Sequence, residues 1–359
     1  MSIQNKITVI IPSLNPDEKL MKVVCGLEEM GFDDIIVVND GSREENLKNF
    51  PSEIEHPCCK ILTHTVNRGK GAALKTAFTY FLENRKDRIG VVTVDGDNQH
   101  KPADVLACAE AMEETGDLVL GVRDFSLPHV PKRSRFGNRT TSLVFRLCCG
   151  MKISDTQTGL RAFPAKILDD MCEVEGDRFE YETNMLLSLS KYGIKISEVK
   201  IETVYIEENQ TSHFRPVRDS MRVYSQILHF LASSLISFTV DNSIFAIGLA
   251  FLGKENRLLC FVLARAFSSA LNFILNKKTV FKNTDKVIFT LLKYYALAVP
   301  ILLISEIGVG FVVANFGGDY FGTAGVVFTT AVKIVIEFIL FILSYRIQRQ
   351  WVFSEKKKK

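Results

Sequence analysis

The chain has 359 residues, of which 47% are hydrophobic and 24% are charged, and this composition excludes a disordered or low-complexity protein. The formal net charge is only +3, but residues 1–226 hold 29 basic and 34 acidic side chains, whereas residues 227–359 hold 15 and 7. Because the basic excess flanks apolar segments and does not cover a globular face, we expect no nucleic acid among the partners.

The first apolar run, residues 7–11, is too short for the core of a secretory signal peptide, which needs roughly 7–15 residues. We therefore expect the first part of the chain to lie in the cytoplasm, with its cysteines as reduced thiols. These cysteines include two adjacent pairs, but they form no Cys-x-x-Cys motif, and no histidine stands at zinc spacing. Their spacing therefore does not favour a metal site.

Residues 1–226 alternate between segments typical of strands and segments typical of helices. Short β-branched runs predict strands at residues 7–11, 35–38, 60–63, 89–94 and 117–120. Longer amphipathic segments predict helices at residues 17–30, 71–82 and 103–112. This order predicts an α/β domain with a mainly parallel sheet, and ligands of such sheets bind beyond the carboxyl ends of the strands.

Acidic side chains follow two of these predicted strands. Asp40 ends the second strand, and Asp95, Asp97 and Gln99 follow the fourth. Two carboxylates in a tight glycine turn can share one hard divalent cation, and Mg²⁺ and Mn²⁺ prefer such oxygen ligands. The basic, glycine-rich segment 67–71 opens a helix, where a phosphate group is favoured. We therefore expect a diphosphate-containing substrate at this edge of the sheet.

The motifs and their order resemble family 2 inverting glycosyltransferases. They are Val-Ile-Ile-Pro-Ser-Leu-Asn at 9–15, Val-Asn-Asp-Gly-Ser at 38–42, Asn-Arg-Gly-Lys-Gly at 67–71 and Asp-Gly-Asp-Asn-Gln-His at 95–100. With Gly-Val-Arg at 121–123 and Asp-Thr-Gln-Thr-Gly-Leu-Arg at 155–161, they look most like the branch of dolichol-phosphate mannose synthase and polyprenyl-phosphate glucosyltransferase. The resemblance implies that residues 1–226 form a GT-A (nucleotide-diphospho-sugar transferase) domain.

The resemblance also implies roles for individual residues. Those expected to bind the nucleotide sugar are Pro12, Asn15, Asp40, Lys70 and Asp95. Those expected to hold Mg²⁺ or Mn²⁺ are Asp97 and Gln99. Those expected to face the acceptor phosphate are Arg123, Arg133, Arg135, Ser212 and Arg215. The expected catalytic residues are Asp95, Asp97 and Arg123. The segment around Arg133 and Arg135 is also typical of a basic amphipathic helix at a bilayer surface.

Residues 227–359 hold four apolar stretches, each near or above the length of about 20 residues that crosses a bilayer. They cover residues 227–252, 258–275, 287–316 and 324–347. Basic side chains precede the first stretch, separate the second from the third, and follow the fourth, whereas residues 317–323 have none. The positive-inside rule then places both termini and the catalytic domain in the cytoplasm. We expect an integral membrane protein with four spans in a bacterial or archaeal plasma membrane.

This second part also repeats internally. Residues 273–281 (Phe-Ile-Leu-Asn-Lys-Lys-Thr-Val-Phe) resemble residues 345–353 (Tyr-Arg-Ile-Gln-Arg-Gln-Trp-Val-Phe). Two helical hairpins of common origin are therefore expected, and they resemble the GtrA-like four-helix membrane domain. Ionisable residues inside the stretches, such as Lys333 and Glu337, pair within the bundle or line a path for a lipid headgroup, and both interpretations stay open.

The expected function is transfer of one sugar, glucose or mannose, from a UDP or GDP donor to polyprenyl or dolichyl phosphate, with inversion. A lipid phosphate is already anionic near neutral pH and needs positioning more than a base. One alternative is a hydroxyl-acceptor enzyme of polysaccharide synthesis, which would need a carboxylate base such as Glu180 or Glu182. Another is a scaffold or flippase for lipid-linked sugars, for which four helices per chain would call for a homo-oligomer.

Overall fold

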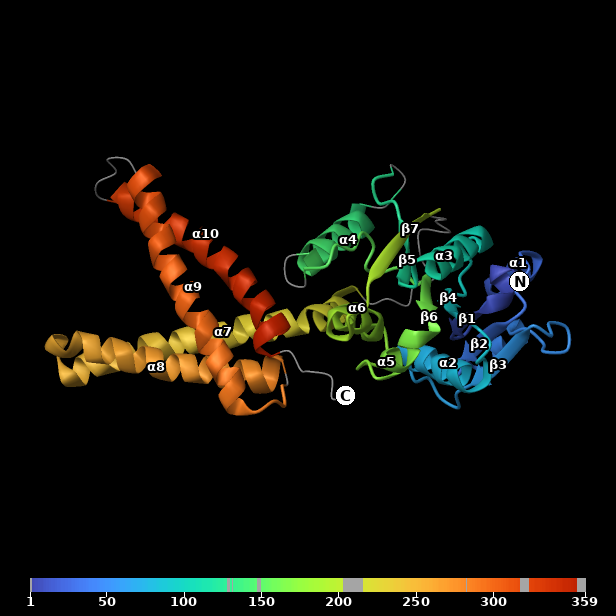
Figure 1. Cartoon of the computed structure of the whole chain (residues 1–359), viewed down its shortest axis with the longest axis horizontal. Coiled ribbons are helices and arrows are strands. Elements are labelled where there is room, and N and C mark those ends of the chain that lie inside the picture. The colour runs from blue at the N-terminus through green and yellow to red at the C-terminus, as the bar shows by residue number, and fades with distance from the viewer. Residues whose placement is uncertain are drawn as a thin grey trace. The chain divides into compact units, whose positions relative to one another are not determined.

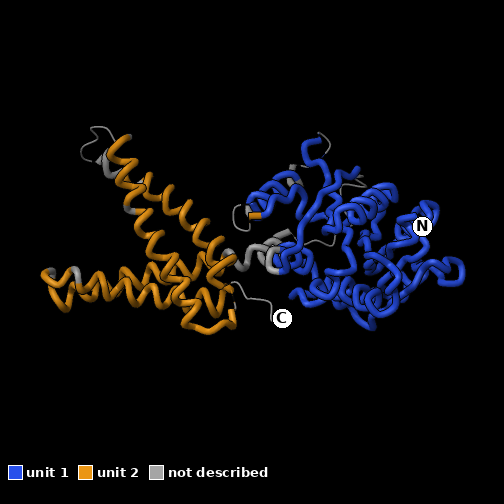
Figure 2. Tube along the Cα trace, viewed as in Figure 1, with its two compact units in different colours: residues 1–146, 151–223 blue, residues 147–150, 224–359 orange. Residues whose placement is uncertain are grey.

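Figure 1 shows the computed structural model of the chain, which describes residues 2–127, 130, 132–146, 150–202, 216–281, 283–316 and 323–353. The chain divides into two compact units (Figure 2). One comprises residues 1–146 and 151–223, and the other comprises residues 147–150 and 224–359. This division lies three residues from the domain boundary expected after residue 226.

The first unit is built on a seven-stranded sheet with the order β3-β2-β1-β4-β6-β5-β7. The strands are β1 (Ile7–Ser13), β2 (Ile35–Asn39), β3 (Cys59–Thr63), β4 (Gly90–Thr93), β5 (Leu118–Arg123), β6 (Arg161–Pro164) and β7 (Ile196–Ile201). β6 runs antiparallel to β4 and β5, and the other described pairs are parallel. The mainly parallel sheet agrees with the expected α/β class.

Helices cover both faces of this sheet. They are α1 (Lys19–Glu29), α2 (Lys70–Asn84), α3 (Pro102–Thr115), α4 (Lys132–Val144), α5 (Leu168–Cys172) and α6 (Glu180–Tyr192). The apolar side chains of α1 recur at helical spacing, and Leu20, Val24 and Leu27 are buried with α3 against one face, beside Val9 and Ile35. On the other side, α2 contacts β1, β2, α5 and α6. The core therefore lies in two layers around fully buried strands.

The chain direction of β1, β2 and β4 brings their carboxyl ends to one edge of the sheet. β1 pairs in parallel with both β2 and β4, with Ser13 opposite Asn39 and Ile10 opposite Thr93. The segments that follow these strands carry Asn15, Asp40 and Asp95. This edge is where the site lies.

The second unit is built from four long described helices, α7 (Pro216–Leu252), whose first residues belong to the first unit, α8 (Arg257–Leu275), α9 (Val287–Phe316) and α10 (Thr323–Ile347). Within the described residues, three stretches are long and apolar enough to cross a membrane, namely Leu228–Leu252, Leu259–Val280 and Val287–Asn315. α10 coincides with the fourth expected stretch, but its side chains are described only in part, so four spans stay a prediction.

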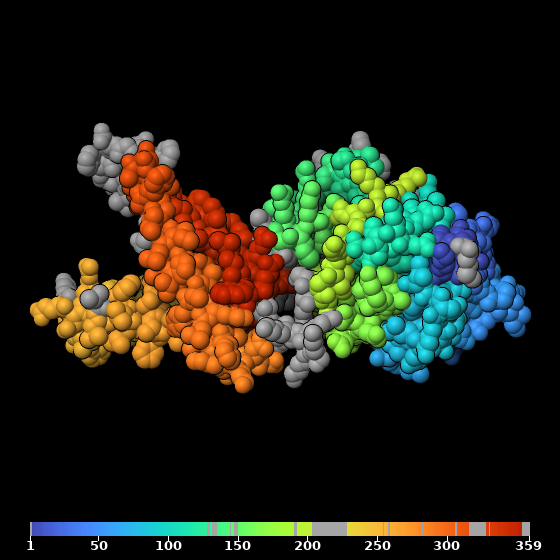
Figure 3. Space-filling view, viewed as in Figure 1, coloured from blue at the N-terminus to red at the C-terminus, as the bar shows by residue number. Residues whose placement is uncertain are grey.

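Large apolar side chains are exposed on these helices, whose surface Figure 3 shows from one side. Among them are Phe251, Phe267 and Phe311, with 85%, 63% and 63% of their surface exposed. Exposed apolar surface of this extent is unfavourable in water and is typical of helices that face lipid.

The internal repeat appears as paired helix ends. α8 and α10 each continue into a π-helical turn, Asn276–Val280 and Gln348–Val352. The two residues that begin these turns meet, because the side-chain amide of Asn276 donates to Oε1 of Gln348 at 3.0 Å. Ser233 donates to Oδ1 of Asn276 at 2.6 Å, so the buried amide is bonded on both sides.

Aromatic contacts between the repeats are reciprocal. The rings of Phe281 and Phe353, which hold equivalent places, stack with centroids 5.0 Å apart. Phe273 packs on Phe353 at 6.0 Å, and the equivalent Tyr345 packs on Phe281 at 5.8 Å. Such reciprocity is what two copies of one unit related by a two-fold axis produce. The resemblance of this unit to GtrA-like domains stays a prediction.

Candidate active site

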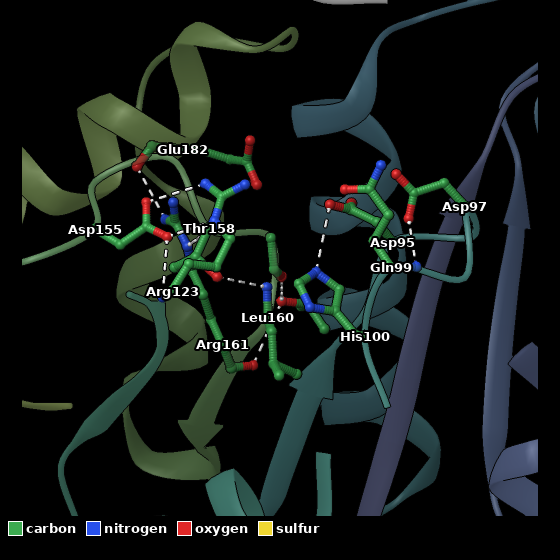
Figure 4. Close-up of polar contacts among 12 residues, drawn as sticks. Asp95, Asp97, Gln99, His100, Arg123, Asp155, Thr158, Leu160, Arg161 and Glu182 are labelled. Atoms are coloured by element: carbon green, nitrogen blue, oxygen red, sulfur yellow. Dashed lines mark hydrogen bonds and ion pairs between the residues drawn. The ribbon is translucent and has the colours of Figure 1, made fainter. Parts of the chain in front are cut away.

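Asp95 is the centre of a partly buried charge cluster at the carboxyl edge of the sheet (Figure 4). Nζ of Lys70, the first residue of α2, lies 2.7 Å from Oδ1 of Asp95 and 2.9 Å from Oε1 of Glu182. Nε2 of His100 lies 3.9 Å from Oδ2 of Asp95. One lysine therefore joins carboxylates that come from the end of β4 and from the first turn of α6.

The pKa values in this cluster follow from its charges. Burial works against ionisation of Asp95, but Lys70 and His100 outweigh it and hold the pKa of this carboxyl well below its usual range. Burial likewise disfavours the charged form of Lys70, but Asp95 and Glu182 outweigh it and raise the pKa of the lysine above its ordinary value. Asp95 and Lys70 are therefore both ionised at neutral pH.

Asp97 lies on the same loop as Asp95, but its pKa is shifted in the opposite direction. Burial, followed by the negative charge of Asp95, raises the pKa of the Asp97 carboxyl. Its Oδ1 accepts a hydrogen bond from the backbone N–H of Gln99 at 3.2 Å, and Figure 4 shows these side chains on one loop with Asp95. The loop therefore gathers more negative charge than Lys70 offsets, and a divalent cation would relieve this excess.

Asp40 is turned away from solvent toward the loop before α2. Its side chain accepts hydrogen bonds from the backbone N–H groups of Arg68 at 2.9 Å and Gly69 at 2.7 Å. Nδ1 of His64 lies 2.7 Å from its Oδ1. In this structure Asp40 fixes the loop that presents Lys70, and its contact with a nucleotide base stays a prediction.

The segment after β1 is tied to the segment after β2. Pro12 is the register partner of Val38. The backbone N–H of Asn15 donates to Oγ of Ser42 at 2.8 Å, and Oδ1 of Asn15 accepts from the backbone N–H of Arg43 at 2.9 Å. Asn15 has a φ of 50°, a left-handed conformation that asparagine tolerates better than most residues. Pro12, Asn15 and Asp40 are thus brought to one end of the sheet, and their contact with the nucleotide sugar stays a prediction.

Arg123, at the end of β5, is held by a buried carboxylate. Its Nε lies 2.7 Å from Oδ2 of Asp155, and its Nη2 donates to Oδ1 at 3.1 Å. Asp155 is fully buried, so this two-point contact fixes the plane of the guanidinium. Asp155 belongs to the motif at 155–161 but was given no role in the sequence analysis.

The other residues expected at the acceptor phosphate are described only in part. Arg135 lies in α4, and its Nη2 donates to the backbone carbonyl of Leu127 at 2.8 Å. For Arg133 the structure describes the helical backbone, and Ser212 and Arg215 lie outside the described residues. The acceptor roles of all four arginines and of Ser212 stay predictions.

Two further residues of the 155–161 motif, for which no role was predicted, shape the site. A Cβ on Gly159 would collide with the carboxylate of Asp95, so only glycine lets these two chain segments approach so closely. Arg161 is buried, and its Nε donates to the carbonyl of Thr158 at 2.9 Å and its Nη1 to that of Glu182 at 3.0 Å. Within the described part of the chain, its Nη2 has no hydrogen-bond partner. The presence of Gly159 and Arg161 in the 155–161 motif was the one sign in the sequence that they belong to the site.

Comparison with known proteins identifies the class. Residues 8–171 match the family model of glycosyl transferase family 2. An uncharacterized protein of Methanocaldococcus jannaschii is 31% identical over 212 residues, which cover 57% of this chain and 84% of that protein. The chain belongs to glycosyl transferase family 2, and it is a glycosyltransferase, as its ordered motifs predicted.

Two further relatives have names that state an activity. The UDP-N-acetylglucosamine–dolichyl-phosphate N-acetylglucosaminyltransferase of Methanococcus voltae is 29% identical over 220 residues, 56% of this chain and 86% of that protein. The polyprenol monophosphomannose synthase of Mycolicibacterium smegmatis is 25% identical over 201 residues, 54% of this chain and 75% of that protein.

Proposed function

We propose that this glycosyltransferase transfers one sugar from a nucleotide sugar to a polyprenyl or dolichyl phosphate, with inversion at the anomeric carbon. The observation that carries the choice of acceptor is the contact of Glu182 with Lys70 at 2.9 Å. A hydroxyl acceptor would need a free carboxylate base, and of the two candidates, Glu180 and Glu182, the ammonium of Lys70 already binds Glu182. The relatives named for dolichyl phosphate and polyprenol support the same acceptor class.

The site residues would have different roles in a single-displacement reaction. Lys70 and Asp95 would orient the donor diphosphate and sugar, because both are held charged at fixed positions. Arg123, whose guanidinium is held in one orientation by Asp155, would contribute positive charge toward the acceptor phosphate. The phosphate attacks the anomeric carbon as an anion, so the chain has no proton to remove.

Asp97 and Gln99 fit a divalent cation. Burial and the charge of Asp95 disfavour the ionised form of Asp97 and raise the pKa of its carboxyl, and both side chains offer the oxygen ligands that Mg²⁺ and Mn²⁺ take. A bound ion would offset the charge of the departing nucleoside diphosphate. We further propose a plasma membrane location with four spans and with both termini in the cytoplasm.

A donor screen tests this function. Full-length protein in detergent is incubated with undecaprenyl phosphate or dolichyl phosphate, Mn²⁺ and one donor at a time: UDP-glucose, GDP-mannose or UDP-N-acetylglucosamine. We propose glucose or mannose as the sugar, and the third donor is included because a relative is named for it. Mass spectrometry should find a lipid phosphate heavier by one sugar with a single donor.

Two variants make this screen decisive. Asp97→Ala should abolish the product, whereas Lys86→Ala, which changes an exposed side chain on the connection after α2, should not. Nucleotide release without any glycosylated lipid would instead indicate another acceptor. Product formation that survives Asp97→Ala would contradict the assignment of the metal site.

A further inference from the structure

A second cluster of metal-binding side chains lies at the end of the sheet opposite the active site. Cys25 and Glu28 lie three residues apart on α1, so they share one face of the helix. His56, Cys58 and Cys59 lie where the chain enters β3. β3 runs parallel to β2, so the start of β3 is remote from the strand ends that carry the active site.

The donor atoms in this cluster are close together. Those of Cys25, Glu28 and His56 all lie within 4.8 Å of one another, and so do those of Glu28, Cys58 and Cys59. Glu28 belongs to both groups. Its carboxylate lies 2.8 Å from Nδ1 of His56 and accepts a hydrogen bond from the thiol of Cys58 at 2.9 Å.

The backbone holds these side chains in place independently of any ligand. The N–H of Cys59 donates to the carbonyl of His56 at 2.9 Å, which closes a turn with Pro57 at its second position, where proline is favoured. The carbonyl of Cys58 accepts from the N–H of Ile35 at 2.8 Å, which ties the turn to β2. The cluster is therefore largely preorganised.

The chemistry of the donors selects one kind of cation. Thiolates and imidazole are ligands of Zn²⁺, whereas Mg²⁺ and Mn²⁺ prefer the all-oxygen type of site proposed at Asp97 and Gln99.

We propose that Cys25, Glu28, His56, Cys58 and Cys59 form a structural site for one Zn²⁺ ion, which takes four of these five donors. Binding releases each ligating thiol proton to solvent, and the ion is neither oxidised nor reduced. The ion would join α1 to the start of β3, which is one of the two edge strands of the sheet. Spacing in the sequence could not reveal the site, because the donors come from two elements.

Metal analysis of the full-length protein tests this proposal. Protein supplied with Zn²⁺ during expression and then desalted should contain about one zinc ion per chain. The double substitution His56→Ala and Cys58→Ser should remove it. Cys172→Ser, at a cysteine outside the cluster, and Asp97→Ala, at the active site, should both retain it.

A spectroscopic measurement on the unaltered chain covers the case in which the double variant does not fold. Cobalt exchanged into the protein should give the near-ultraviolet absorption of a thiolate-to-cobalt charge transfer, and added Zn²⁺ should remove it. Zinc content well below one ion per chain, together with no charge-transfer band, would overturn the proposal. So would zinc that persists in a folded double variant.

Discussion

Glu182 distinguishes the two acceptor classes at the scale of a single side chain. Its carboxylate lies 2.9 Å from Lys70, and its side chain is 15% exposed. If the acceptor is a phosphate, we expect Glu182→Gln to keep at least about a tenth of the kcat/KM for lipid phosphate, because no proton is transferred. A loss of roughly 10²–10⁴-fold, the usual contribution of a general base, would favour the hydroxyl acceptor.

The raised pKa of Asp97 predicts that the stability of the chain depends on pH, and the metal proposed at this residue would change that dependence. Its folded-state pKa is raised by burial and by Asp95, so its contribution to stability is full below the ordinary carboxyl pKa and is lost as the pH rises through the raised value. At neutral pH the ionised carboxylate therefore destabilises the metal-free fold. A bound cation should reverse this effect.

Thermal unfolding of the full-length protein checks this dependence. Without added divalent cation at pH 7, we expect Asp97→Asn to unfold at a higher temperature than the wild type, since the variant carries no charge there. Mn²⁺ should then raise the midpoint of the wild type more than that of Asp97→Asn. Equal stabilisation of both proteins by Mn²⁺ would count against a metal at this residue.

Ligands of parallel sheets bind beyond the carboxyl ends of the strands, and this rule explains why several site residues could be predicted individually. Asp40 and Asp95 follow parallel strands, and this alone places them at one edge of the sheet. The rule does not give side-chain direction. Asp40 turns toward the amides of Arg68 and Gly69 because the loop before α2 presents unpaired N–H groups there, and no local pattern encodes that loop conformation.

At the scale of elements, most of the predicted strands have apolar runs, the exception being the Lys-Ile-Leu-Thr segment of β3 at residues 60–63. β1 and β2 are buried along nearly their whole length and appear within two residues of the expected bounds. β6 has four residues and begins with Arg161, and β7 alternates charged with apolar residues, so neither has such a run. Both depend on pairing with strands distant in sequence. β5 extends to Arg123 because β7 pairs along its full length.

The packing of α2 on α6 sets the distance from Lys70 to Glu182. A Cβ on Gly71 would lie 2.5 Å from Cβ of Tyr181, so these helix ends meet only because residue 71 is glycine. We expect Gly71→Ala to destabilise the fold by about 1–3 kcal/mol through overpacking and to lower sugar transfer by separating the ion pair. Gly310→Ala, which meets no atom within 4 Å, is the matched control. Unfolding midpoints equal to the wild type in both variants would refute this account.

At the scale of the whole molecule, the chain combines a catalytic unit with a unit built from two similar hairpins. The repeat was visible in the sequence because its aromatic and basic positions recur. The direct pairing of Asn276 with Gln348, and of Phe281 with Phe353, was not predictable, because it depends on how the hairpins pack. Residues that are equivalent in the repeat therefore meet one another in the structure.

Reporter fusions test the proposed orientation of this second unit. The positive-inside rule places the C-terminus in the cytoplasm and the connection between α7 and α8, residues 253–256, on the other side. Green fluorescent protein fused after residue 359 should fluoresce, and alkaline phosphatase inserted at residue 254 should be active. Inactive phosphatase at residue 254, or an expressed C-terminal fusion that does not fluoresce, would contradict this orientation or the number of spans.

The most direct test of the whole account compares two acceptors that differ only in the phosphate. Full-length protein with its preferred nucleotide sugar and Mn²⁺ is given either undecaprenyl phosphate or undecaprenol, and glycosylated lipid is measured by mass spectrometry. We predict product from the phosphate alone, because the site offers Arg123 to bind an anion while Lys70 occupies Glu182. Transfer to the alcohol at a comparable rate would contradict the lipid-phosphate mechanism.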